Sequence, residues 1–149
     1  MMEMPGILVG IDGSSHSRAA LEWAVREAGV RHVPLTVLTV HQAVAGYMSA
    51  AVPYPGDDDL TGKAREAARQ ETDEVLDSLG DSPRLPSVTV QAVNGLPAQE
   101  ILRAAADADL VVVGSRGAGG FRQLLMGSVS SQVTHHAHCP VVVIPRSDR

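Results

Sequence analysis

Four short runs of Val, Ile and Leu most constrain what this chain can fold into. They span Ile7 to Ile11, Leu35 to Val40, Leu110 to Val113 and Val141 to Ile144, and nearly all of their residues are apolar. Such runs are typical of strands buried on both faces, as in parallel sheets. In a fifth stretch, Val88 to Val93, valines alternate with Thr89 and Gln91, which predicts an edge strand with one wetter face.

Helical patterns separate these runs. Apolar residues recur at helical spacing from Ala20 to Ala28 after the polar start Ser14 and Ser15, and an Ala- and Glu-rich stretch extends from Leu60 to Leu79. A third helix is expected to begin near Pro97, and a fourth to open at Ser128 and end before Cys139. This alternation predicts a Rossmann-like α/β fold, a five-stranded parallel sheet of order 3-2-1-4-5 with helices on both faces. We expect residues 1–149 to form a single domain.

In that strand order, the first and fourth strands are neighbours whose connections leave in opposite directions. A crevice is then expected at their carboxyl ends, where such folds bind ligands. Asp12 and Gly114 both lie at this point of the sequence. The stretch from Gln42 to Asp59 reads as a long loop near the mouth of the crevice, either functional or merely a solvated excursion.

Composition excludes several classes of protein. The formal net charge of -5 argues against a nucleic-acid partner, because Lys and Arg supply most of the affinity for phosphate backbones. No apolar stretch approaches the roughly 20 residues of a membrane-spanning helix, and the start of the chain does not resemble a secretory signal. A single cysteine, Cys139, allows no intramolecular disulfide. These features predict a cytoplasmic protein that is not embedded in a membrane.

Two glycine turns follow the fourth predicted strand. The chain reads Gly114-Ser115-Arg116-Gly117, and after a short apolar piece it continues as Gly127-Ser128-Val129-Ser130 into the fourth predicted helix. Glycines allow a ligand to approach the backbone closely, and a helix N-terminus offers free amide hydrogens to an anion. Ser128 is expected to cap the helix, and the Ser128 and Ser130 hydroxyls are expected near phosphate oxygens. The pattern is neither a Walker P-loop nor a GxGxxG turn.

The spacing Gly114-x2-Gly117-x9-Gly127-Ser128 resembles the nucleotide-binding signature of the ATP-binding branch of the universal stress protein family. The similarity extends to Val9 to Ser14, Gly95 to Ala98 and Cys139 to Ile144. It covers the chain from Ile7 to Pro145 except for the loop from Gln42 to Asp59. The resemblance implies an adenine nucleotide alpha hydrolase-like fold.

The resemblance also implies a ligand site and a partner. Asp12 and the backbone at Val40 would hold the adenosine end of ATP, with Mg²⁺ as a companion ion. Ribose and phosphates would be lined by Gly114, Gly117, Gly127, Ser128, Val129 and Ser130. The last strand, Val141 to Ile144, would pair with a second copy to form a homodimer that acts as a nucleotide-dependent regulator of the stress response.

Several of these residues have a simpler structural interpretation. Asp12 followed by Gly13 can simply start a turn, although its position favours ligand contact. Arg116 is as well explained by a solvated loop as by phosphate contact. Three histidines precede Cys139, at positions 135, 136 and 138, and could bind a metal, but adjacent side chains diverge on a helix and a structural role is favoured. His41 is expected to be an ordinary surface histidine.

The sequence favours binding over catalysis, because it offers no base or metal site positioned to activate water for phosphoryl transfer. The expected function is therefore nucleotide binding with at most slow hydrolysis. Three alternatives stay open: a slow ATP hydrolase or phosphotransferase, a binder of AMP or cyclic AMP, and a dimeric scaffold whose pocket is vestigial.

Overall fold

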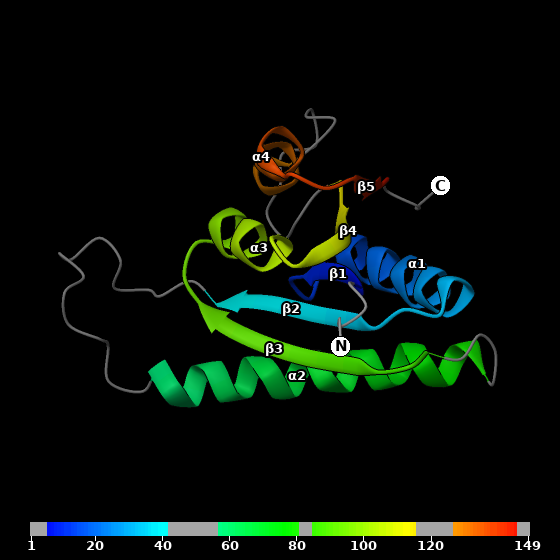
Figure 1. The fold of residues 1–149 in the computed structure, drawn as a ribbon. Coiled ribbons are helices and arrows are strands. Elements are labelled where there is room, and N and C mark those ends of the chain that lie inside the picture. Colours follow the sequence, from blue (N-terminus) through cyan, green and yellow to red (C-terminus); the bar gives the residue numbers. More distant parts are fainter. Residues whose placement is uncertain (1–5, 42–56, 81–84, 116–126, 146–149) are drawn as a thin grey trace, which may run out of the picture.

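Strands and helices alternate through the described part of the chain, residues 6–41, 57–80, 85–115 and 127–145, in the computed structural model (Figure 1). The order of these described elements is β1 (Gly6–Ile11), α1 (Ser15–Arg31), β2 (Leu35–His41), α2 (Asp57–Leu79), β3 (Val88–Asn94), α3 (Pro97–Ala105), β4 (Ala108–Gly114), α4 (Ser128–His136) and β5 (Val141–Ile144). All five predicted strands are present, and four of them extend beyond the predicted bounds: β1, β2 and β3 by one residue, and β4 by two residues at its start and one at its end.

The strands form one parallel sheet of order β3-β2-β1-β4-β5, as predicted. Val9 of β1 lies between Val37 of β2 and Val112 of β4, and all three side chains are fully buried. The weakly patterned strand β3 is an edge strand, and the exposed residues Thr89 and Gln91 account for its alternation. The Rossmann-like α/β fold predicted from the sequence is confirmed.

Helices lie on both faces of the sheet (Figure 1), and a hydrophobic core lies between the sheet and the helices on each face. On one face, α1 and α2 pack against the odd-numbered residues of β1 and β2, with Leu21 and Val75 fully buried. On the other face, α3 and α4 pack around Ile101 and Val133, against Leu38 and Val111. Because α1 follows β1 and α4 follows β4, the connections after these neighbouring strands leave on opposite faces. The topological switch point is therefore where the sequence predicts it.

The predicted start of α2 was wrong. Helix α2 begins at Asp57, three residues before the expected start at Leu60, so Asp57 to Asp59 belong to the helix and not to the preceding loop. Carboxylates in a first helical turn interact favourably with the helix dipole, which makes an aspartate run a suitable start. The rest of that predicted loop, residues 42–56, lies outside the described residues. Among the described helices, none is long and apolar enough to cross a membrane.

Candidate functional site

The turn after β1 is held by Asp12. The Ser14 amide donates to the Asp12 carboxylate at 2.9 Å, and the Asp12 amide donates to the Ser17 hydroxyl at 3.1 Å. Gly13 has a φ of 84°, a conformation that favours glycine. Ser14 then caps α1, because its hydroxyl accepts from the Ser17 amide at 3.2 Å. The structural interpretation of Asp12 as a turn residue is thus observed, and its contact with a ligand stays a prediction.

The backbone carbonyl of Val40 in β2 points toward β1, near the turn that follows this strand. In a parallel ladder, alternate residues turn both their N–H and C=O groups to the same neighbouring strand. The Pro34 carbonyl accepts from Ile7 of β1, whereas the His41 carbonyl accepts from Gly95 on the β3 side. Even-numbered residues of β2 therefore face β1. The last pair of β1 and β2 is Ile11 with Thr39, so the Val40 carbonyl extends past the end of β1.

The end of β4 is bonded directly to the start of α4. Gly114 is the last residue of β4, and the buried residue Ser115 follows it. The Ser115 carbonyl accepts from the Gly127 amide, and the Ser115 amide donates to the Ile144 carbonyl at 2.8 Å. Residues 116–126 lie between these anchor points and outside the described residues, so the predictions for Gly117 and Arg116 stay untested.

The expected cap of α4 was wrong. Gly127 occupies the N-cap position with extended backbone and no side-chain cap bond, and Ser128 is the first helical residue. The helix itself begins at Ser128, as the sequence predicts, and the bond from the Gly127 amide to the Ser115 carbonyl holds its N-cap against the end of β4. The first bond within the helix is from the Ser131 amide to the Gly127 carbonyl. The amides of Ser128, Val129 and Ser130 therefore have no acceptor within the helix.

The two signature hydroxyls lie in different surroundings. Ser128 is exposed, whereas Ser130 is 2% exposed and its hydroxyl donates to carbonyls of the chain. The structure thus brings Asp12, Gly114, Gly127 and the first turn of α4 to the carboxyl edge of the two neighbouring strands. Of the Ser128 and Ser130 hydroxyls, only that of Ser128 belongs to an exposed residue and can meet a ligand from solvent.

The sequence interpretation missed two buried imidazole nitrogens. Within the described residues, Nδ1 of His16 and Nε2 of His41 are buried without a hydrogen-bond partner. His16 lies in the first turn of α1 and His41 ends β2, so both belong to the carboxyl edge of the sheet. His41 is half-buried rather than an ordinary surface residue. Only its position directly after an apolar strand hinted at this.

Burial also affects a carboxylate on α2. Half-buried Glu71 has a pKa raised above its ordinary value, first because burial disfavours its charged form. The positive charge of Arg18 opposes this rise, whereas the negative charges of Glu74 and Asp12 add to it. Arg18 of α1 pairs with Glu74 at 2.9 Å and so links the two helices on this face of the sheet.

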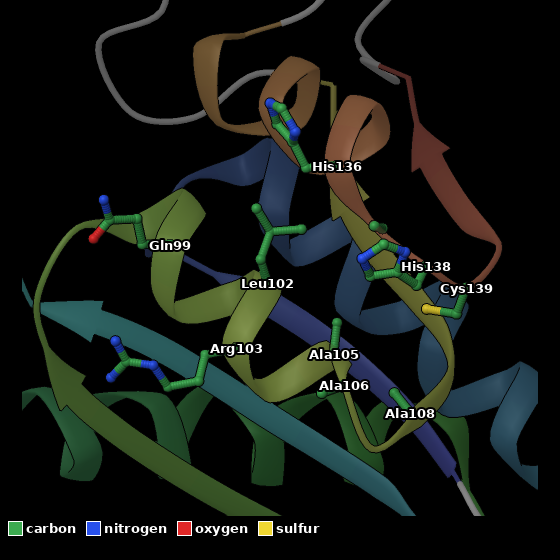
Figure 2. A pocket seen from close by; sticks show the side chains of 10 residues that line it. Gln99, Leu102, Arg103, Ala105, Ala106, Ala108, His136, His138 and Cys139 are labelled. Carbon is green, nitrogen blue, oxygen red and sulfur yellow. The ribbon is translucent and has the colours of Figure 1, made fainter.

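Two of the three histidines before Cys139, His136 and His138, line a separate cavity. A cavity of about 350 Å³ lies between α3 and the end of α4, with Leu102 and Arg103 on one side and His136, His138 and Cys139 on the other (Figure 2). Among the described residues, no group of three or more His, Cys, Asp or Glu side chains could hold a metal ion. Burial raises the pKa of the Cys139 thiol, and the charge of Asp109 adds to the rise. This cavity lies apart from the first turn of α4.

The sheet order, the switch point between β1 and β4 and the anchored start of α4 define a Rossmann-like α/β protein. The model of the universal stress protein family matches residues 4–145. The chain therefore belongs to the universal stress protein family.

Relatives of known name agree. A universal stress protein of Mycolicibacterium smegmatis is 36% identical over 150 residues, which cover 97% of this chain and 49% of the relative. Universal stress protein Rv2623 of Mycobacterium tuberculosis is 36% identical over 149 residues, covering 96% of this chain and 48% of the relative. The chain thus spans about half the length of the curated relatives it matches.

Solved structures share the fold. Universal stress protein UspA from Lactobacillus plantarum is 25% identical, with a TM-score of 0.68 over 97% of this chain and 99% of that one. A universal stress protein in complex with cAMP is 22% identical, with a TM-score of 0.65 over 96% and 98% of the two chains. The Archaeoglobus fulgidus universal stress protein in complex with dAMP is 23% identical, with a TM-score of 0.65 over 96% and 99%.

Proposed function

We propose that residues 1–149 act as one universal stress protein domain that binds an adenine nucleotide at the carboxyl ends of β1 and β4. ATP is the proposed ligand, with Mg²⁺ as its companion and the Asp12 carboxylate as a candidate ligand of the ion. The domain would serve the stress response in the reducing cytoplasm as a nucleotide-dependent regulatory dimer. Binding, with at most slow hydrolysis, is its proposed activity.

One observation carries this proposal: the first turn of α4 is fixed beside the end of β4. The bond between Gly127 and Ser115 holds the helix start in place, and three successive amides of that turn have no acceptor within the helix. Amides at the positive end of a helix dipole favour an anion such as a phosphate group. The Ser128 hydroxyl adds an exposed donor in the same turn.

The adenosine end is assigned to the neighbouring strand ends. The Val40 carbonyl extends past the end of β1, and Asp12 begins the turn beside it. A carbonyl and a carboxylate are acceptors, which suits the hydroxyls of a ribose and the amino group of adenine. Two universal stress proteins of the same fold are in complex with cAMP and dAMP, which favours an adenine nucleotide for this chain as well.

The proposed dimer pairs β5 with its copy. All four residues of Val141–Ile144 are apolar and half-buried, and β5 is an edge strand. The Pro140 carbonyl accepts from Val111 of β4, and the Ile144 carbonyl accepts from Ser115, the residue after β4, so even-numbered residues of β5 face the sheet. Val141 and Val143 then turn their N–H and C=O groups outward. An apolar edge of this kind is a template for pairing with another strand.

The test is calorimetric titration of nucleotide-stripped protein with ATP, ADP, AMP and cyclic AMP in Mg²⁺, followed by an assay for phosphate release. The decisive variant is Ser128→Asp. A carboxylate at the first helical position stabilises the helix by about 0.3–1 kcal/mol but repels phosphates. We expect at least one adenine nucleotide to bind the wild type, and Ser128→Asp to weaken that binding by 100-fold or more, roughly 3 kcal/mol, while the protein stays folded.

Ser131→Asp is the matched control, because it adds the same charge one position beyond the first turn. We expect it to weaken binding far less than Ser128→Asp. If no adenine nucleotide binds the wild type, or if both variants weaken binding equally, the proposed site is wrong. Rapid phosphate release that Ser128→Asp abolishes would instead identify an ATP hydrolase at the same site.

A further inference from the structure

The hydroxyl of Ser130 closes a junction between a strand and a helix. Its oxygen lies 3.1 Å from the Ser115 carbonyl oxygen and 3.1 Å from the Gly127 carbonyl oxygen. The Ser115 carbonyl also accepts from the Gly127 amide. Ser115, Gly127 and Ser130 thus form a local hydrogen-bond network at the point where β4 ends and α4 begins. We call this network the Ser115 junction.

The surroundings of this hydroxyl separate it from solvent. Ser130 is 2% exposed, whereas Ser128 in the same turn is exposed. A serine hydroxyl has one proton to donate, and here two carbonyls of the chain accept it. A phosphate oxygen would have to compete with both carbonyls for that proton. The hydroxyl is therefore arranged to hold the backbone rather than to bind a ligand.

We propose that Ser130 is a positioning residue, whose hydroxyl fixes the first turn of α4 against the end of β4 and so orients the amides that bind phosphate. This rests on the proposed nucleotide site, and it divides the two signature serines by role. The Ser128 hydroxyl contacts the ligand. The Ser130 hydroxyl acts through the Ser115 junction, and only its backbone amide faces the phosphates.

The junction also continues into the sheet. Ile144 is the last residue of β5, and its carbonyl accepts from the Ser115 amide at 2.8 Å. Ser115 therefore uses its amide to hold the edge strand and its carbonyl to hold the start of α4. Loss of the Ser130 hydroxyl is expected to loosen this junction locally. The amides of α1, on the other face of the sheet, should stay as well protected from hydrogen exchange as in the wild type.

Amide hydrogen exchange in nucleotide-free protein tests this inference without any ligand. In Ser130→Ala, exchange of the Gly127 amide should accelerate about tenfold, the effect of losing one buried hydrogen bond. Ser130→Cys replaces the hydroxyl with a somewhat larger group that is only a weak donor, so it should accelerate exchange in the same way. Ser131→Ala, a neighbouring serine of the same helix, should leave exchange of the Gly127 amide unchanged, as should Ser128→Ala.

Nucleotide titration of the same variants completes the test. Ser130→Ala and Ser128→Ala should both weaken binding, but only Ser130→Ala should change exchange in the ligand-free protein. Weaker binding with unchanged Gly127 exchange in Ser130→Ala would overturn the inference, because the hydroxyl would then contact the ligand. Wild-type exchange in Ser130→Cys would also overturn it. Faster exchange in a protein that binds no nucleotide would support the junction and contradict the proposed function.

Discussion

Glu71 gives the stability of this protein a pH dependence of predictable sign. Burial raises the pKa of this carboxyl above its ordinary value, so between the two values the folded chain binds more protons than the unfolded chain. Stability from this group is therefore present below the ordinary pKa and is lost as pH rises through the raised one. The positive charge of Arg18 favours the charged form of Glu71 and so lowers this pKa. It opposes only part of the effect of burial, because the net shift of the Glu71 pKa is upward.

Glu71→Gln should remove this dependence. We expect the variant to have a higher Tm than the wild type at pH 7, and the difference to shrink toward zero below pH 4, where Glu71 is protonated in both states. Thermal melts between pH 3 and pH 8 measure it. Glu66→Gln, at an exposed position of the same helix, is the control. An equal Tm difference at pH 4 and pH 7 would contradict this explanation.

At the scale of single elements, α1 depends on its cap. The Ser14 hydroxyl accepts from the Ser17 amide at 3.2 Å, and Ser17 in turn holds the Asp12 amide. Ser14→Ala should lower the free energy of unfolding by about 1 kcal/mol, and Ser14→Asp should keep most of it, because aspartate is also a good N-cap. Urea denaturation measures both. Ser15→Ala, one position further along, should change stability by less than about 0.5 kcal/mol, and a similar loss there would argue against the cap.

The strands were predictable from the sequence because burial on both faces leaves an unbroken apolar run, as in Leu110 to Val113. The ends of the strands were harder to predict. Strand β4 begins at Ala108, which pairs with Gly6 of β1, because a parallel ladder needs pairing partners and not large apolar side chains. The N-cap of α4 was harder to predict than its start. Ser128 satisfies every local preference for a cap, yet Gly127 occupies the N-cap position and bonds to Ser115, a residue 12 positions away in the sequence.

The candidate site was predictable in outline for the same reason. Strand order alone brings Asp12 and Gly114 to one edge of the sheet. The different surroundings of the Ser128 and Ser130 hydroxyls could not be predicted, because they depend on which face of α4 meets the end of β4. The same holds for the buried Nε2 atom of His41, because burial of a single side-chain atom depends on tertiary packing and not on the local sequence.

At the scale of the whole molecule, the outward backbone of β5 tests the proposed dimer. Proline at Val143 would remove an N–H group that faces away from β4, so Val143→Pro should leave the sheet intact but prevent self-pairing. Val143→Thr keeps the N–H group and is the control. Sedimentation equilibrium should show a dimer for the wild type and for Val143→Thr, and a monomer for Val143→Pro. A dimer that survives in Val143→Pro would place the interface elsewhere.

Ser115 is hydrogen-bonded both to the last residue of the edge strand β5 and to Gly127, the N-cap of α4. If binding of a ligand shifts Ser115, it also shifts β5. We propose that the two copies pair through this strand. Association and ligand affinity would then be thermodynamically linked, and the linkage is reciprocal. Whatever factor a nucleotide adds to the association constant of the dimer, the dimer must add to the affinity for that nucleotide. A concentrated cell extract and a dilute assay would therefore report different affinities for the same chain.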